Sequence, residues 1–209
     1  MRISFRLLTA ATLVAAVQNP AGAQLRSNWS VQASGLFSDF GGDSFRQINS
    51  GFGIELQARR RITRLWSVGC GFQATYHDHR VPTGDVRFEG GFCEPRKAWA
   101  LRNESVFPYI GLRGAFVQRT DTNNDSTSFN ASTFGWTTNL GAGLMVPVGA
   151  RTARFPFLID LGGSVGYASF NNLVFDRPGV VIATSRTGGH GVMYMLRAGV
   201  AVGLLAPHP

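Results

Sequence analysis

Apolar and polar side chains alternate with a period of two along much of the chain. The run Phe134–Val148 shows the pattern most clearly, because one set of alternate positions is apolar and free of charge: Phe134, Trp136, Thr138, Leu140, Ala142, Leu144 and Val146. A period of two predicts a β-strand. An uncharged face about ten or more residues long is typical of a strand that crosses a lipid bilayer.

The same alternation recurs and predicts eight strands. They span Trp29–Asp39, Ser50–Ile62, Leu65–His77, Asp85–Leu101, Phe107–Arg119, Phe134–Val148, Phe155–Phe170 and Val192–Leu205. Short turns are expected at Ile62–Arg64, Arg102–Ser105 and Gly149–Thr152, and longer polar loops at Phe40–Asn49, Asp78–Gly84, Thr120–Ser132 and Asn171–Gly189. Short turns at one rim and long loops at the other are typical of outer-membrane barrels. The predicted fold is all-β, an eight-stranded antiparallel up-and-down transmembrane β-barrel.

The fourth predicted strand interrupts the alternation. Val86 and Phe88, taken as outward residues, set a parity that would turn Cys93 into the barrel. A β-bulge at Gly90–Gly91 would add one residue and reverse the parity. We therefore expect a bulge there, after which Cys93 faces outward and Glu94 and Arg96 face inward.

The chain contains two cysteines, Cys70 and Cys93. An even number in an exported chain favours a disulfide. With the bulge both would face outward, and the midpoint between them falls in the predicted loop, between Val81 and Pro82. We expect a cross-strand disulfide; the alternative is two free buried thiols.

The N-terminus has the features of a signal peptide. Arg2 and Arg6 precede the apolar run Leu7–Val17, and Ala21-Gly-Ala23 is a small-x-small cleavage site. We expect residues 1–23 to be removed and residues 24–209 to form the barrel domain. No later segment approaches the roughly 18 apolar residues of a membrane helix, so insertion would have to use strands.

Composition and charge narrow the possible functions. Only 15% of residues are charged, against about 25% in soluble domains, and there are 26 glycines. The net charge of +8 does not indicate nucleic-acid binding, since all but one of the basic residues are arginines scattered through an exported chain. A soluble calycin-like barrel around a ligand is the rival architecture, but its outer face would need many more charges.

Charges on the predicted strands fall mostly on the polar face. The expected inward set is Glu55, Arg59, Arg87, Glu89, Glu94, Arg96, Arg113, Asp160 and Arg197. Lipid penalises an outward charge, and side chains just fill an eight-stranded lumen. We expect these residues to form a salt-bridged polar network that plugs the lumen, with Asp160 and Arg197 paired. A narrow polar pore is the alternative.

Candidate catalytic and metal sites are weak. Gly162–Gly166 matches the G-x-S-x-G motif around Ser164, but no strand-to-helix turn follows. His77 and His79 alternate on a strand and could contribute to a metal site. A lipid-modifying barrel enzyme would need a histidine beside a serine, and His77 or His190 with Ser126 or Ser169 are the available pairs. None has supporting spacing, so we expect no catalytic, cofactor or metal site.

Several segments resemble the small eight-stranded outer-membrane barrels, the OmpX/OmpA-transmembrane-like superfamily. They are Pro108–Gly114, Phe134-Gly-Trp136, Gly141–Leu144 and the Arg61–Trp66 turn. The resemblance implies an outer-membrane location and a structural or surface-interaction role. We expect outer-membrane lipid as a partner, a possible surface ligand or protein at the long loops, no nucleic acid and a monomer. A deacylase or acyltransferase acting on outer-membrane lipid is the alternative class.

Overall fold

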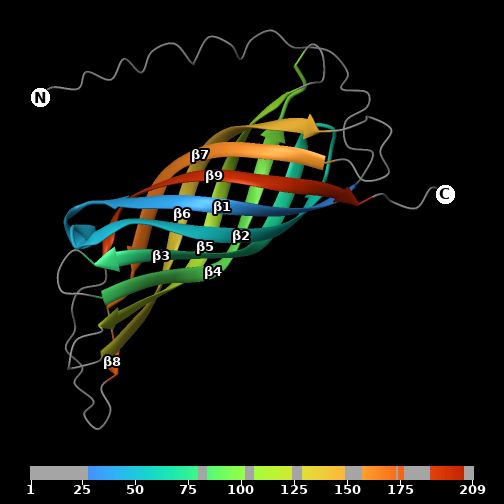
Figure 1. Cartoon of the computed structure of the whole chain (residues 1–209). Coiled ribbons are helices and arrows are strands. Elements are labelled where there is room, and N and C mark those ends of the chain that lie inside the picture. The colour runs from blue at the N-terminus through green and yellow to red at the C-terminus, as the bar shows by residue number, and fades with distance from the viewer. Residues whose placement is uncertain are drawn as a thin grey trace, which may run out of the picture.

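The chain forms one closed antiparallel β-sheet (Figure 1). The computed structural model describes residues 28–79, 84–101, 106–123, 129–148, 157–172, 174–176 and 189–204. The expected signal peptide, residues 1–23, lies outside the described residues, as does Ser126. Among the described residues, no helix has the length and apolar character to cross a membrane.

Eight long strands make the barrel wall. They are β1 (Trp29–Gly41), β2 (Ile48–Arg61), β3 (Trp66–His79), β4 (Gly84–Ala98), β5 (Phe107–Asn123), β6 (Phe129–Val148), β7 (Phe157–Phe170) and β9 (His190–Leu204). Each long strand pairs with the next one along the chain, and β1 pairs with β9 to close the sheet. This is the predicted eight-stranded antiparallel up-and-down barrel, and the prediction of the fold is confirmed.

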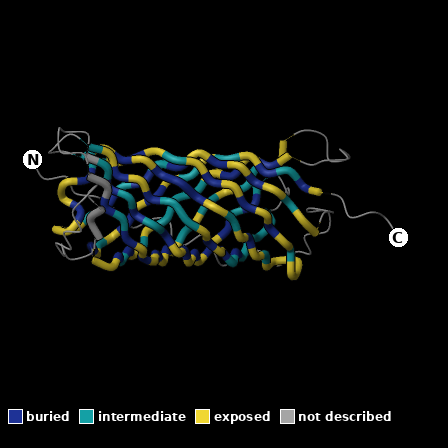
Figure 2. Tube along the Cα trace, turned by 90° about the horizontal axis from the view of Figure 1, so that it is seen from below, coloured by how far each residue is buried: buried dark blue, intermediate teal, exposed yellow. Residues whose placement is uncertain are grey.

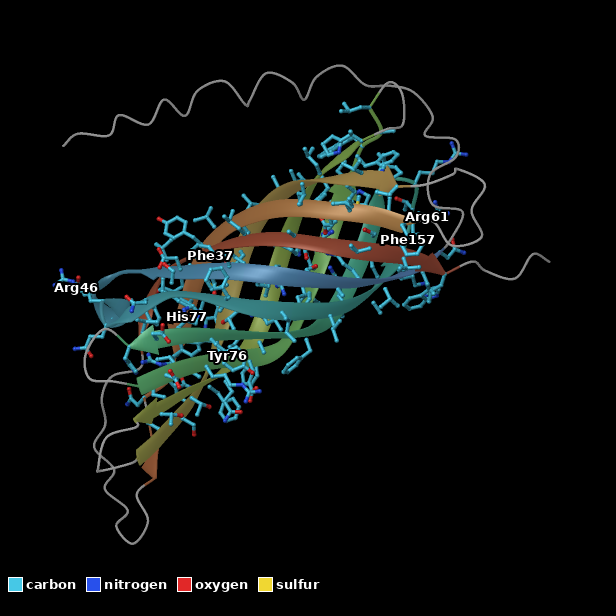
Figure 3. All side chains as sticks on the ribbon, viewed as in Figure 1. Phe37, Arg46, Arg61, Tyr76, His77 and Phe157 are labelled. Carbon is cyan, nitrogen blue, oxygen red and sulfur yellow. A yellow bond between two sulfur atoms is a disulfide. The ribbon has the colours of Figure 1, made fainter. Side chains whose placement is uncertain are left out.

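Two short elements lie at the end of the barrel where β1 leads into β2, called here the loop end. The 3₁₀ helix η2 (Asp43–Phe45) connects those two strands, and β8 (Val174–Asp176) pairs with β6 beyond the end of β7. Figure 3 shows Arg46 at the loop end and Arg61 and Phe157 at the opposite turn end.

The β5–β6 hairpin is longer than expected. Its pairing continues to Asn123 and Phe129, whereas β6 pairs with β7 only from Gly135 onward. The described residues of the expected loop Thr120–Ser132, 120–123 and 129–132, are therefore strand. The sequence there is rich in Thr, Asp and Asn, so the apolar–polar alternation that predicts strands is not visible.

The apolar positions of the strands face outward. Figure 2 shows exposed and buried residues alternating along the trace. Large apolar side chains are exposed on every long strand except β4, among them Trp29, Phe52, Phe72, Phe116, Leu140, Leu161 and Leu196. Soluble monomers seldom expose contiguous apolar patches beyond a few hundred Å². This barrel has the inside-out arrangement of a protein surrounded by lipid.

The bulge expected at Gly90–Gly91 is absent. The β3–β4 register runs without a shift from Trp66↔Lys97 to Asp78↔Asp85. Val86 and Phe88 are buried in the lumen, with 0% and 2% of their surface exposed, rather than facing lipid. The prediction failed because it took apolar residues as outward, whereas the lumen at the loop end is itself apolar.

Aromatic residues close the loop end of the lumen. Phe45 of η2 turns inward and is 1% exposed, and its ring centroid lies 4.9 Å from that of Phe40. Phe40 in turn contacts Phe88 at 4.7 Å, and Phe88 contacts Phe170 at 5.3 Å. The other members of this cluster, which we call the aromatic cap, are Leu36, Ile48, Val86, Phe92, Ala115, Val117, Ala168, Met193 and Met195.

The disulfide forms on the outer face of the barrel. Cys70 and Cys93 are direct partners in the β3–β4 register, with their Cα atoms 4.1 Å apart, and their sulfur atoms are bonded. The predicted disulfide is confirmed, although an unbroken register and not a bulge brings the cysteines together.

Candidate functional site

A network of charged side chains fills the middle of the lumen. Its members come from β2, β4, β5, β7 and β9: Glu55, Arg59, Glu94, Arg96, Arg113, Asp160 and Arg197. No side chain among them is more than 9% exposed. Strand parity turns each of them inward, which is the side where a charge avoids the lipid.

Arg96 joins two carboxylates at the centre of the network. Its Nε donates to Glu94 Oε1 at 2.7 Å, and its Nη1 donates to Asp160 Oδ2 at 2.8 Å. The guanidinium also lies over the Tyr109 ring, 4.4 Å from the ring centroid. Asp160, which is 0% exposed, accepts two further hydrogen bonds at 2.7 Å, from Tyr109 Oη and Gln32 Nε2. Its buried charge is therefore fully compensated.

Arg197 connects this centre to the β2 side of the lumen. Its Nη1 donates to Glu94 Oε2 at 3.0 Å and to Glu55 Oε1 at 3.4 Å, and its Nη2 donates to Tyr109 Oη at 2.9 Å. The structure places Arg197 Nε 3.6 Å from Asp160 Oδ2, so the pair expected from the strand register does lie together.

Glu55 anchors the remaining arginine on β5. Arg113 Nη1 donates to Glu55 Oε2 and its Nη2 donates to Gln73 Oε1, both at 2.6 Å. Arg113 also covers the Phe92 ring at 3.5 Å, so it links the network to the aromatic cap.

Arg59 extends the network toward the turn end. Its Nη2 donates to Gln57 Oε1 at 2.9 Å and lies 3.6 Å from Glu94 Oε2, and its Nη1 reaches Ser67 Oγ at 3.2 Å.

Glycines in the wall make room for the network. A Cβ added to Gly143 or Gly162 would collide with the Tyr109 hydroxyl, and one added to Gly111 would lie 2.8 Å from Glu94 Oε1. The glycines of β5, β6 and β7 are therefore the counterpart of the large polar side chains that cross the lumen.

Two residues of the expected inward set face outward instead. Arg87 and Glu89 form an ion pair with each other on the outside of β4, with 47% and 28% of their side chains exposed. Arg87 also lies over the outward Tyr76 ring, 5.3 Å from its centroid. The cause is the unbroken β4 parity, which turns Val86 and Phe88 inward.

A second buried ion pair escaped prediction. Arg119 Nε donates to Asp121 Oδ1 at 2.7 Å, and both residues are less than 9% exposed. His79 Nε2 lies 3.8 Å from Asp121 Oδ2. The pair went unnoticed because Thr120–Ser132 was taken as a loop.

Among the described residues, the serine and histidine candidates do not assemble a catalytic site. Ser164 faces the lumen in mid-strand, and its Oγ has no hydrogen-bond partner there. Ser169 and His190 are register partners across β7 and β9, but no side-chain hydrogen bond joins them. Neither serine therefore has the nucleophile–base contact that acyl transfer uses.

His77 lies inside the barrel and is held by hydrogen bonds. Its Nδ1 donates to the Asn49 carbonyl oxygen at 2.9 Å, which leaves Nε2 to accept from Ser38 and Thr75, both at 3.1 Å. Ser38 is 1% and His77 2% exposed under the aromatic cap, where a substrate cannot reach them. Among the described residues no group of three or more potential ligands could hold a metal ion.

An apolar exterior around a closed polar lumen defines the fold of a small outer-membrane β-barrel. Among solved structures, Neisserial surface protein A is similar over 85% of this chain and 98% of its own, with 17% identity and a TM-score of 0.55. The N-terminal barrel of Pseudomonas aeruginosa OprF (15% identity, TM-score 0.42) covers 84% of this chain and 97% of its own. Ail of Yersinia pestis (18% identity, TM-score 0.44) also covers 84% of this chain and 97% of its own. No protein-family model matches the chain, and neither does any curated protein.

Proposed function

We propose that the chain is an integral outer-membrane protein whose barrel is a sealed scaffold and whose loop end makes the contacts with the surroundings. The observation that carries this proposal is the outward apolar face present on seven of the eight long strands, all except β4. Only a lipid environment makes such a face favourable, and only a closed barrel satisfies every strand edge within it.

A sealed lumen is favoured over a narrow pore. Side chains from five strands meet across the middle of the barrel, and the aromatic cap covers its loop end. Described cavities along the lumen measure about 10, 20 and 60 Å³, each room for a few waters at most. We expect no ion conductance above background when the purified barrel is inserted into a planar bilayer.

The contact surface is assigned to the loop end. There the β5–β6 hairpin continues beyond the end of β7, and β8 adds a third strand to it. With the turns in the periplasm, this extension lies on the cell surface, where it is available to a ligand or a protein partner. Among the described residues, no candidate serine has a hydrogen-bonded histidine that could activate it for the catalytic alternative.

Cell fractionation with a heat-modifiability assay tests the membrane assignment. We expect the protein in the outer-membrane fraction, extracted only by detergent. On a denaturing gel the unheated barrel should migrate faster than the heated chain, because boiling unfolds a detergent-resistant sheet. Recovery without detergent, as a soluble monomer of heat-independent mobility, would overturn the proposal.

A further inference from the structure

Unpartnered polar groups face the lumen from β6 and β7. Asn139 is 1% exposed, and neither its Oδ1 nor its Nδ2 has a hydrogen-bond partner among the described residues. Ser164 Oγ is likewise buried without a partner. The two residues lie near each other in the wall, because Asn139 pairs with Gly166 and Ser164 with Gly141. Leaving such groups unsatisfied costs about 1–3 kcal/mol each, so the site is built to contact something.

Both residues line one cavity beside the charged network. It measures about 20 Å³ and is bounded on the network side by Glu94, Arg113 and Arg197. On the wall side it is bounded by Met195 and by glycines, and the missing side chains of Gly111, Gly141 and Gly162 leave it room. This volume suits one water-sized or halide-sized guest.

The cavity lining is rich in hydrogen-bond donors. Among the described residues Arg113 Nε has no hydrogen-bond partner, although the terminal nitrogens of its guanidinium group are engaged. Arg197 Nε lies 3.6 Å from Asp160 Oδ2, and Asp160 is outside the cavity lining. Arg113 Nε, Asn139 Nδ2 and the Ser164 hydroxyl therefore offer three donors, against one unpartnered acceptor, Asn139 Oδ1. The carboxylate of Glu94 already accepts from Arg96 and Arg197. This excess of donors favours a guest that accepts hydrogen bonds.

The net charge of the network also favours an anion as the guest. Four arginines, Arg59, Arg96, Arg113 and Arg197, face three carboxylates, Glu55, Glu94 and Asp160, while the separate Arg119–Asp121 pair balances itself. An excess positive charge in a low-dielectric barrel is unfavourable unless it is paired. One monovalent anion would neutralise the network.

We propose that this cavity binds a single halide-sized monovalent anion, chloride in the cell, held by the Asn139 amide and the Ser164 hydroxyl against the positive side of the network. The anion acts as an internal counterion of the barrel. Nothing in this proposal depends on what the loop end contacts.

Bromide is the probe for a direct test. Crystals of the whole barrel grown in sodium bromide should show one anomalous peak in the lumen, within hydrogen-bonding distance of Asn139 Nδ2 and Ser164 Oγ. Density at that position without anomalous signal would mean an ordered water only, and would overturn the proposal. The bromide concentration is then lowered to about 0.1 M, close to physiological salt. A peak that vanishes at this concentration would mean binding at crystal concentration only, and would also overturn the proposal.

Heat unfolding in detergent gives an independent test in solution. The unfolding midpoint should rise with bromide relative to gluconate at equal ionic strength, because a ligand of the folded state stabilises it. Asn139→Leu should abolish the difference between the two salts. Ser164→Ala should weaken the apparent bromide affinity about fivefold, the loss of one hydrogen bond, and remains informative if the leucine variant fails to fold.

Thr137→Val is the matched control. Thr137 is on the same strand, 2% exposed and equally unpartnered, but it lines a different cavity toward the aromatic cap. This variant should keep the full bromide response. An equal response in the wild type, Asn139→Leu and Ser164→Ala would show a general salt effect and overturn the proposal.

Discussion

Each buried arginine of the lumen contacts at least one carboxylate, and the arginines of the central network share these carboxylates. Arg96, for example, contacts Glu94, Asp160 and the Tyr109 ring, and it is 1% exposed. Removing one partner of a buried ion pair leaves the other charge uncompensated, which is more costly than never having had the pair. The interior of this barrel is therefore sensitive to single substitutions in a way that its surface charges are not.

Arg96→Met tests that sensitivity. We expect the free energy of unfolding in detergent to fall by about 3–5 kcal/mol, because Glu94 and Asp160 lose a shared partner. Urea titration followed by the shift in gel mobility measures it. Arg46→Met is the control, since the Arg46–Asp43 pair is 77% and 88% exposed, and its loss should cost less than about 1 kcal/mol. Equal effects of the two substitutions would refute the role assigned to Arg96.

Tyr109 and Gly162 should be energetically coupled. Gly162→Ala places a methyl group against the Tyr109 hydroxyl and should destabilise the barrel by about 1–3 kcal/mol, the usual cost of overpacking. Tyr109→Phe removes that hydroxyl, so the alanine should cost less in the phenylalanine background. A double-mutant cycle on unfolding free energies measures the difference. Additive effects would show that the two groups do not compete for space.

At the level of elements, the sequence predicts the strands of the barrel wall better than the residues that fill the lumen. Seven of the eight long strands are visible because lipid favours an apolar side chain at every second position, whereas the outer face of β4 carries none that is large. Phe45 carries no such signal, since a single aromatic residue in a polar loop has no period. The inward turn of Val86 and Phe88 was misread for a related reason: hydrophobicity distinguishes lipid from water, but it does not distinguish lipid from an apolar lumen.

Phe45→Ala tests whether η2 is part of the barrel interior. The substitution removes a 1%-exposed ring from the aromatic cap, and the expected loss of unfolding free energy is about 3–5 kcal/mol. Phe52→Ala makes the same change on the outer face, where the ring is 71% exposed, and should cost less. If η2 only lay on the rim of the barrel, Phe45→Ala would lower the free energy of unfolding less than Phe52→Ala does.

At the scale of the whole molecule, the barrel has three zones whose side chains meet different environments. Lipid-type side chains cover the outside, charges occupy the middle of the lumen, and aromatic rings close its loop end. The sequence predicts a charged interior because lipid penalises an outward charge, although Arg87 and Glu89 do face outward, as an ion pair. It does not predict the hydrogen-bond pattern of this interior, since which arginine meets which carboxylate depends on side-chain lengths and on the glycines opposite them.

Leu140→Arg tests the outer zone. Leu140 is 62% exposed in mid-strand, and an arginine at the bilayer midplane costs about 2–4 kcal/mol. We expect reduced folding into liposomes, followed by gel mobility. Thr122→Arg, on the β5 extension at the loop end, should fold as the wild type does. A barrel that met water on its outside would tolerate both substitutions equally.

The disulfide on the outer face has a consequence for the order of events during biogenesis. Cys70 and Cys93 lie between Val68 and Phe72 on β3 and between Gly91 and Pro95 on β4, on the outer side of the wall, which faces acyl chains. Water-borne oxidants and reductants do not reach that side once the barrel is seated. The bond must therefore form during export, before the barrel inserts into the membrane. Its presence means that β3 and β4 were already paired before insertion.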